Sequence, residues 1–63
     1  MENKLKEIRK EKAMSVSKLA RLSNTSRSRI YAIENGTAEN VTIGTLTRIA
    51  NVLGVAVNDI FVL

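Results

Sequence analysis

The stretch LSNTSRSRIYAIENG, residues 22–36, predicts a short helix that follows another helix after a tight turn. Ile30 and Ile33 are three positions apart in a run that is otherwise polar, so they mark one buried side of a helix, which Gly36 can end. Only a few residues separate this run from the apolar residues before it, and Asn24 among them can adopt a left-handed backbone conformation at low cost. We therefore expect two helices that cross steeply instead of lying antiparallel.

Apolar residues recur at helical intervals along the rest of the chain as well. This spacing predicts five helices, near residues 2–12, 16–23, 27–35, 43–53 and 57–62. Three hydroxyl residues can cap helix starts and two glycines can end helices, namely Ser15, Ser26 and Thr42, and Gly36 and Gly54. Because the sequence has no proline, internal repeat or low-complexity segment, we expect one compact all-α domain over residues 1–63.

The composition excludes several kinds of site. The 63 residues include no cysteine and no histidine, so neither a disulfide nor the commonest zinc ligands are available. The carboxylates are scattered and no glycine-rich phosphate loop occurs, so nothing points to acid–base, nucleophilic or metal chemistry. No segment has the roughly 20 apolar residues that cross a bilayer. We expect a soluble, cytoplasmic protein that is not an enzyme and uses no metal or cofactor.

The positive charge is concentrated in the first half of the chain. The formal net charge is +4, and residues 1–36 hold nine basic and four acidic side chains, whereas residues 37–63 hold one basic and two acidic ones. A positive field attracts polyanions such as nucleic acid, or anionic lipid. The alternative is a solvated surface that only keeps the protein soluble, and charge alone does not decide between them.

The central stretch combines Leu19 and Ala20, the turn at Asn24, the cap Ser26, and Ile30 and Ile33 followed by Glu34, Asn35 and Gly36. Together these residues resemble the Cro/C1-type helix-turn-helix family, which includes phage repressors and many small XRE-type bacterial regulators. Three flanking segments match it in register, LKEIRKEK at 5–12, TLTRIANVLGV at 45–55 and VNDIF at 57–61. The resemblance implies a lambda repressor-like fold of five helices, usually dimeric, that binds double-stranded DNA with its third helix in the major groove.

Four residues depart from the family pattern: Val16 replaces a DNA-contacting glutamine, Asn24 and Ala13 replace glycines, and Ala56 replaces a helix cap. A valine cannot make the glutamine's contacts with the DNA backbone and with the start of the recognition helix. We expect the other three to weaken local geometry more than function, because none of them removes the recognition surface.

The polar side of residues 27–35 is the candidate surface for reading bases. At about 100° per residue, Ser28 and Asn35 lie opposite the two isoleucines, and the two arginines lie on the flanks. We expect base contacts first from Arg27 and Ser28, then from Arg29, Tyr31 and Ala32. Two alternatives stay open, because the arginines can form a solvated flank and Tyr31 can lie over a neighbouring helix as partial core.

Phosphate contacts are expected on both sides of that surface. Unpaired amides at the start of the helix near 16–23, its dipole and nearby hydroxyl groups favour an anion at Ser15, Val16, Ser17 and Ser26. The resemblance implies that Asn35 and Thr37 hold the backbone on the other side. The alternative for the serines is that they only cap helices. Lys18 and Arg21 are expected to contribute to the positive electrostatic field more than to form defined hydrogen bonds with phosphates.

The resemblance also implies an ion pair between Arg9 and Glu34 that would fix the tilt of the recognition helix. The C-terminal VAVNDIFVL is strongly apolar, and Val57, Ile60 and Phe61 are expected in the core. The remaining apolar residues there, Val55, Val62 and Leu63, suggest a patch for a two-fold homodimer. Such a dimer would place its recognition helices about 34 Å apart on a near-palindromic operator.

We interpret the sequence as a transcriptional regulator that binds specific double-stranded DNA, with repression favoured over activation. The main alternative is a protein–protein interaction module of the same fold, which uses its apolar C-terminal helix for binding and its charge for solubility. A membrane-surface role is the weakest reading, because the basic residues surround a recognition helix instead of lining one long amphipathic helix. No small-molecule ligand is evident.

Overall fold

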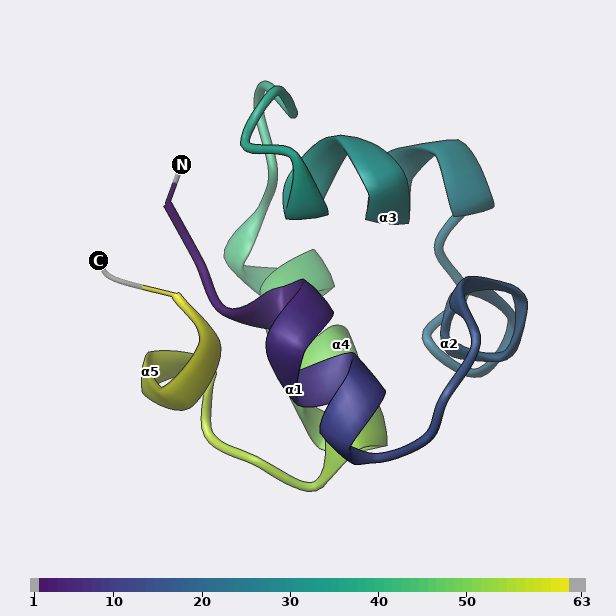
Figure 1. The fold of residues 1–63 in the computed structure, drawn as a ribbon. Helices are drawn as coiled ribbons and strands as arrows, with labels where there is room; N and C mark the ends of the chain where they lie inside the picture. The colour runs from purple at the N-terminus through teal and green to yellow at the C-terminus, as the bar shows by residue number, and fades with distance from the viewer. Residues whose placement is uncertain (1, 62–63) are drawn as a thin grey trace.

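Five α-helices organise residues 2–61, the part of the chain that the computed structural model describes (Figure 1). Their bounds are Leu5–Glu11 (α1), Val16–Leu22 (α2), Arg27–Glu34 (α3), Ile43–Leu53 (α4) and Val57–Ile60 (α5). In Figure 1, α3 lies across the top of the molecule, above α1 and α4, while α2 is seen end-on beside them. The expected all-α fold of five helices is confirmed.

The predicted helix caps form as the sequence indicates. The hydroxyl oxygens of Ser15, Ser26 and Thr42 accept hydrogen bonds from the backbone amides three residues later, at 3.0, 3.1 and 3.2 Å. Each bond satisfies an amide that has no partner inside its helix. At the other ends, Gly36 follows α3 with φ 75° and Gly54 ends α4 with φ 71°. The caps and the glycine stops are therefore confirmed.

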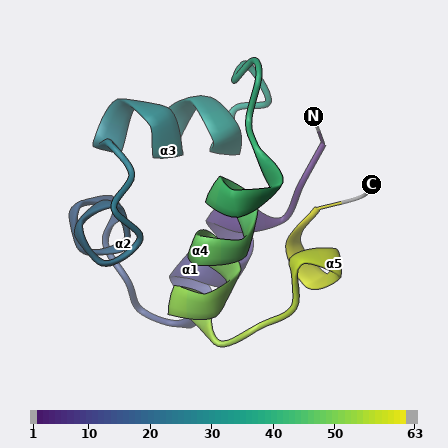
Figure 2. The same ribbon diagram turned by 180° about the vertical axis from the view of Figure 1, so that it is seen from behind.

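The two chain ends differ from the prediction. The first helix begins at Leu5 and not near residue 2, because Asn3 and Phe61 form an isolated antiparallel bridge, with the Lys4 amide donating to the Ile60 carbonyl at 2.8 Å. Phe61 is extended, so α5 ends at Ile60. Residue 62 lies outside the described part. The two ends therefore run side by side, as Figures 1 and 2 both show.

The core lies where α1, α3, α4 and α5 meet, with α2 closing one side. Its buried apolar residues are Leu5, Ile8, Val16, Leu19, Ala20, Ile30, Ile33, Leu46, Ile49, Ala50, Leu53, Ile60 and Phe61. Ile60 and Phe61 are buried as expected, whereas Val57 is only half-buried and packs against the core from outside. Ala56 lacks a capping side chain, but its amide donates to Asp59 Oδ2 at 2.9 Å, which retains half of a capping box.

Ala13 carries a backbone strain that offers a stability test. It has φ 53°, a left-handed conformation that costs a non-glycine residue about 1–2 kcal/mol, and its side chain is exposed. We expect Ala13→Gly to raise the free energy of unfolding by up to about 1 kcal/mol, part of the relief being offset by the entropy of glycine in the unfolded chain. Urea denaturation followed by circular dichroism measures this change.

Gly54 supplies the matched control. It has φ 71°, and a Cβ added there would meet nothing within 4 Å, so Gly54→Ala introduces backbone strain without a steric clash. This variant is expected to lose about 1 kcal/mol of stability. A loss of stability in Ala13→Gly would show that the φ of Ala13 is not the strained feature we describe.

Candidate nucleic-acid interface

The turn between α2 and α3 makes the two helices cross steeply. Ser23 caps the end of α2, Asn24 follows with φ 53°, and the Thr25 amide returns to the Ala20 carbonyl at 2.9 Å. Ala20 is 6% exposed, and its small side chain allows α3 to come close. Figure 1 shows this crossing, with α3 running across the picture and α2 seen end-on. The predicted crossing is therefore present.

Helix α3 has one buried side and one open side. Ile30 and Ile33 are buried, whereas Arg27, Ser28 and Asn35 are exposed. Tyr31 is 53% exposed, so about half of its surface faces solvent and the rest is covered by the protein, which fits both a DNA contact and partial packing over a neighbouring helix. Ala32 is half-buried, and its carbonyl accepts the amides of Thr37 and Ala38 at 2.9 and 3.1 Å.

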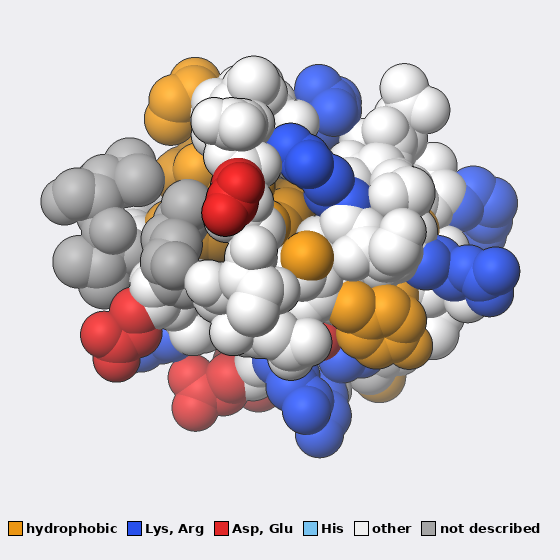
Figure 3. Space-filling model, turned by 90° about the horizontal axis from the view of Figure 1, so that it is seen from above, with side chains coloured by type: hydrophobic (Ala, Val, Ile, Leu, Met, Phe, Trp, Pro, Cys, Tyr) orange, Lys and Arg blue, Asp and Glu red, His pale blue; other side chains and the backbone are white. Residues whose placement is uncertain are grey.

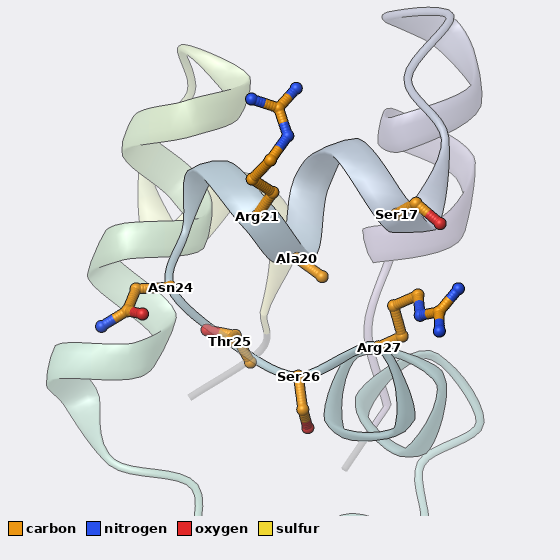
Figure 4. Close-up of a pocket in the computed structure, with 7 residues that line it drawn as sticks. All are labelled: Ser17, Ala20, Arg21, Asn24, Thr25, Ser26 and Arg27. Atoms are coloured by element: carbon orange, nitrogen blue, oxygen red, sulfur yellow. The ribbon is translucent and has the colours of Figure 1, made fainter.

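A hollow lies on each side of the first half of α3. The larger, of about 560 Å³, separates α3 from α2 and is lined by Ser17, Ala20, Arg21, Asn24, Thr25, Ser26 and Arg27 (Figure 4). The other, of about 490 Å³, is lined by Ser26, Ser28, Arg29, Ala32, Thr37, Ala38 and Glu39. In Figure 4, Arg27 at the start of α3 reaches toward Ser17 at the start of α2. The first half of α3 is thus a polar ridge between two depressions.

Arg29 is held differently from Arg27. Its Nη2 donates to the carbonyls of Asn40 and Glu39 at 3.3 and 3.5 Å, and the residue is half-buried. Arg29 therefore connects α3 to the loop over residues 37–42. The structure brings Arg27 and Ser28 to the exposed ridge but turns the second arginine toward this loop.

The far end of α3 is anchored by Arg9. Its Nε lies 2.6 Å from Glu34 Oε2 and its Nη2 lies 3.3 Å from Oε1, so the expected pair meets in bidentate geometry. The two side chains are 11% and 3% exposed. The hydrogen bond with Glu34 raises the pKa of Arg9 above its usual value, outweighing the opposing effect of burial. The carboxylate of Glu34 thus favours the charged form of Arg9, whose Nη1 also donates to the Met14 carbonyl at 3.0 Å.

The expected phosphate-binding residues lie at both ends of the motif. The amides of Val16 and Ser17 are in the first turn of α2, and Ser15 and Ser26 use their oxygens as cap acceptors. Ser17 and Ser26 line the larger hollow, and Thr37 lines the smaller one. Thr37 Oγ1 donates weakly to the Ala32 carbonyl at 3.4 Å, and Asn35 is exposed at the end of α3.

Two residues that sequence reasoning missed also contact this motif. Asn3 Nδ2 donates to the Ile33 carbonyl at 2.8 Å, while its Oδ1 accepts the Leu5 amide at 3.0 Å. Arg48 Nε donates to the Ser23 carbonyl at 2.9 Å. Asn3 is a capping residue type before an apolar helix and Arg48 is the only basic residue beyond position 36, but neither feature indicates the residue's distant partner.

The charges on this face are unevenly distributed. Seen from the side of α3, most Lys and Arg side chains lie across the middle of the face and at the end formed by α2, whereas the acidic ones lie toward the opposite end (Figure 3). An anion approaching α3 therefore meets a positive field beside Arg21 and Arg27.

The expected dimer patch is only partly described. Val55 is half-buried and packs against the core, while Val62 and Leu63 lie outside the described residues. Over residues 2–61, the large apolar side chains with the most exposure are instead Leu22, Tyr31 and Ile43. Within that range no helix is long and apolar enough to span a bilayer, and no acidic cluster that could bind a metal ion is present.

Two short helices that cross at a tight turn, with the second exposed and flanked by cations, define a helix-turn-helix domain. A family model described as the Cro/C1-type helix-turn-helix DNA-binding domain matches residues 4–63. The chain therefore belongs to the Cro/C1-type helix-turn-helix family, whose members are DNA-binding domains and not enzymes. The comparison with curated protein sequences gives no significant match.

Solved structures of SinR are similar to this chain. The structure of SinR, the master regulator for biofilm formation, in complex with DNA is 34% identical with a TM-score of 0.80, over 87% of each chain. The N-terminal DNA-binding domain of SinR from Bacillus subtilis is 34% identical with a TM-score of 0.79, over 87% of this chain and 80% of that one. The SinR–SinI complex also matches at 34% identity and a TM-score of 0.80, over 87% of this chain and only 53% of the matched one. Family and fold together support a DNA-binding regulator.

Proposed function

We propose that this protein regulates transcription by binding specific double-stranded DNA with α3 in the major groove. The observation that carries this proposal is the polar ridge of α3, which stands exposed between two hollows and beside a positive field. A ridge of one helix is the shape that the major groove admits. The similarity to a structure of SinR in complex with DNA supports DNA binding by this chain.

Arg27 and Ser28 are the proposed principal base readers. Both are exposed near the start of α3, where side chains of a groove-bound helix reach base edges, and arginine can bind guanine through two hydrogen bonds. Tyr31 and Ala32 are proposed as further contacts, the alanine through its methyl group. Arg29 would have to break its hydrogen bonds with the loop carbonyls to reach a base, so we consider it a weaker candidate for base contact than Arg27.

The proposed phosphate contacts flank the ridge. A cap serine accepts a backbone hydrogen bond with its oxygen but keeps its own hydrogen to donate, so capping and phosphate binding by Ser15 and Ser26 are compatible. The amides of Val16 and Ser17 would bind on the same side. Asn35 and Thr37 would bind the phosphate backbone beyond the other end of α3.

A two-fold dimer would give the protein a near-palindromic operator. We propose that Val55, Val62 and Leu63 contribute to its interface, and that the bound dimer represses transcription because it excludes other proteins from the same DNA. Two recognition helices about 34 Å apart would read half-sites one helical turn apart. Sedimentation that shows only monomers, both free and on a two-half-site duplex, would exclude this arrangement.

Selection of bound duplexes from a random pool tests the proposed function. We expect a defined consensus, and we expect Arg27→Ala and Ser28→Ala each to relax it at the positions that the missing side chain reads, at a cost of about 1–3 kcal/mol for a bidentate contact. A pool that stays unenriched at about 50 mM salt, where phosphate contacts are strongest, would favour the protein–protein interaction module instead.

A further inference from the structure

Arg48 lies on α4, away from the basic half of the sequence, and none of the contacts proposed above uses it. Its side chain is exposed, yet its guanidinium is bonded to protein at two places. Nε donates to the Ser23 carbonyl at 2.9 Å, and Nη2 donates to Thr45 Oγ1 at 3.4 Å. The planar fork of the guanidinium thus joins the helix-turn-helix turn to α4.

The Ser23 carbonyl is at the point where the chain bends. Ser23 is the C-cap of α2, so its carbonyl has no partner inside the helix, and the left-handed Asn24 follows directly. A carbonyl oxygen can accept two hydrogen bonds. Thr25 Oγ1 provides one at 3.1 Å and Arg48 provides the other, so the carbonyl at the bend is fully bonded.

The contact extends to the start of α4. Thr45 Oγ1 lies 3.1 Å from Thr42 Oγ1, and Thr42 caps α4 by accepting the Thr45 amide at 3.2 Å. Ser23 and Thr45 are buried, at 1% and 9% exposed. A continuous polar chain therefore connects the bend before α3 to the first turn of the helix that provides much of the core.

We propose that Arg48 is a positioning residue for DNA recognition, which holds the α2–α3 turn against α4 and so sets the tilt of α3. This inference rests on the proposed function, because the tilt matters only if α3 reads DNA. The competing role is a direct phosphate contact, since the side chain is exposed and charged. The two roles predict different salt dependence, because a phosphate contact releases counterions and a contact with a protein carbonyl does not.

The test compares Arg48→Met and Arg48→Lys with the wild type, by fluorescence anisotropy on the selected duplex and on a random duplex. If Arg48 positions α3, affinity of Arg48→Met for the selected duplex falls about tenfold, the size expected for a lost charge-assisted hydrogen bond. The slope of log affinity against log salt stays unchanged. Arg48→Lys keeps the charge but lacks the planar guanidinium that bonds to Ser23 and Thr45 together, so it is expected not to restore wild-type affinity.

Thr45→Val is the matched variant that cannot involve phosphate, because Thr45 is buried. It removes the second acceptor of Arg48 and is expected to lower affinity for the selected duplex in the same direction. In the double variant with Arg48→Met, the two effects should not add, because both break the same polar chain.

The proposal is overturned if Arg48→Met reduces the salt slope by about 0.9, as one lost phosphate contact would, and Arg48→Lys restores binding. Unchanged affinity of Arg48→Met for the selected duplex also overturns it.

If the wild type selects no duplex, the proposed function fails. Hydrogen exchange of the Thr25 amide, which donates to the Ala20 carbonyl, then still tests the contact between Arg48 and Ser23. If the Thr25 amide exchanges about tenfold faster in Arg48→Met than in the wild type, Arg48 holds the α2–α3 turn against α4. Unchanged exchange excludes this role.

Discussion

Glu34→Ala is expected to lower the free energy of unfolding by about 3 kcal/mol, because it leaves the Arg9 guanidinium without its carboxylate in a mostly buried position. The change is large for a chain of this size, whose total stability should be about 3–9 kcal/mol at typical values per residue. Thermal and urea unfolding followed by circular dichroism measure the loss. We expect the midpoints of both transitions to fall clearly below those of the wild type.

A double variant separates an unpaired charge from lost packing. Arg9→Met with Glu34→Leu removes both charges and keeps most of the buried volume, and such replacements of a buried ion pair are often neutral. It should therefore recover at least half of the stability lost in Glu34→Ala. If Glu34→Ala is less than about 1 kcal/mol below the wild type, the pair is no stronger than an exposed surface ion pair, and our account of how α3 is anchored is wrong.

Arg27→Glu is expected to weaken binding to the selected duplex by about 100-fold, because it would replace the proposed bidentate base contact with a carboxylate that faces DNA. Arg27 lines the larger hollow, between α2 and α3, and is exposed on the polar ridge. Fluorescence anisotropy at a fixed salt concentration measures the change in affinity.

Lys10→Glu is the matched charge reversal away from the interface. Lys10 is on α1 and lines a separate depression with Asn3, Lys4, Lys6 and Glu7, which shares no residue with the two hollows beside α3. It changes the net charge by the same amount, so it should weaken binding by less than about tenfold through the general field. Equal losses in the two variants would mean that Arg27 contributes only charge and contacts no base.

The sequence predicts most of the helices because their ends are chemically marked. Ser15, Ser26 and Thr42 cap the helices they precede, and the left-handed glycines end two of them. The start of α1 could not be located in this way, because the pairing of Asn3 with Phe61 joins residues at opposite ends of the chain. Helical periodicity reports local structure only, so it extended the first helix over residues that form a long-range bridge.

In the candidate site, too, the features set by local helical geometry could be predicted, and those set by long-range contacts could not. The exposure of Arg27 and Ser28 follows from their angular distance from Ile30 and Ile33, so it could be predicted from helical geometry. The turning of Arg29 toward the Glu39 and Asn40 carbonyls could not, because it depends on how the loop over residues 37–42 folds. The contact of Arg48 with Ser23 spans 25 positions and likewise has no local signal.

The most direct measurement of the central claim is an NMR titration of the labelled protein with the selected duplex at about 50 mM salt, where phosphate contacts are strong. We expect the largest amide shift changes at the start of α2, in the first half of α3 and at residues 35–37, and little change in α5. Changes concentrated in α4 and α5 with α3 unaffected, or no changes at all, would contradict the claim that the exposed ridge of α3 enters a groove of DNA.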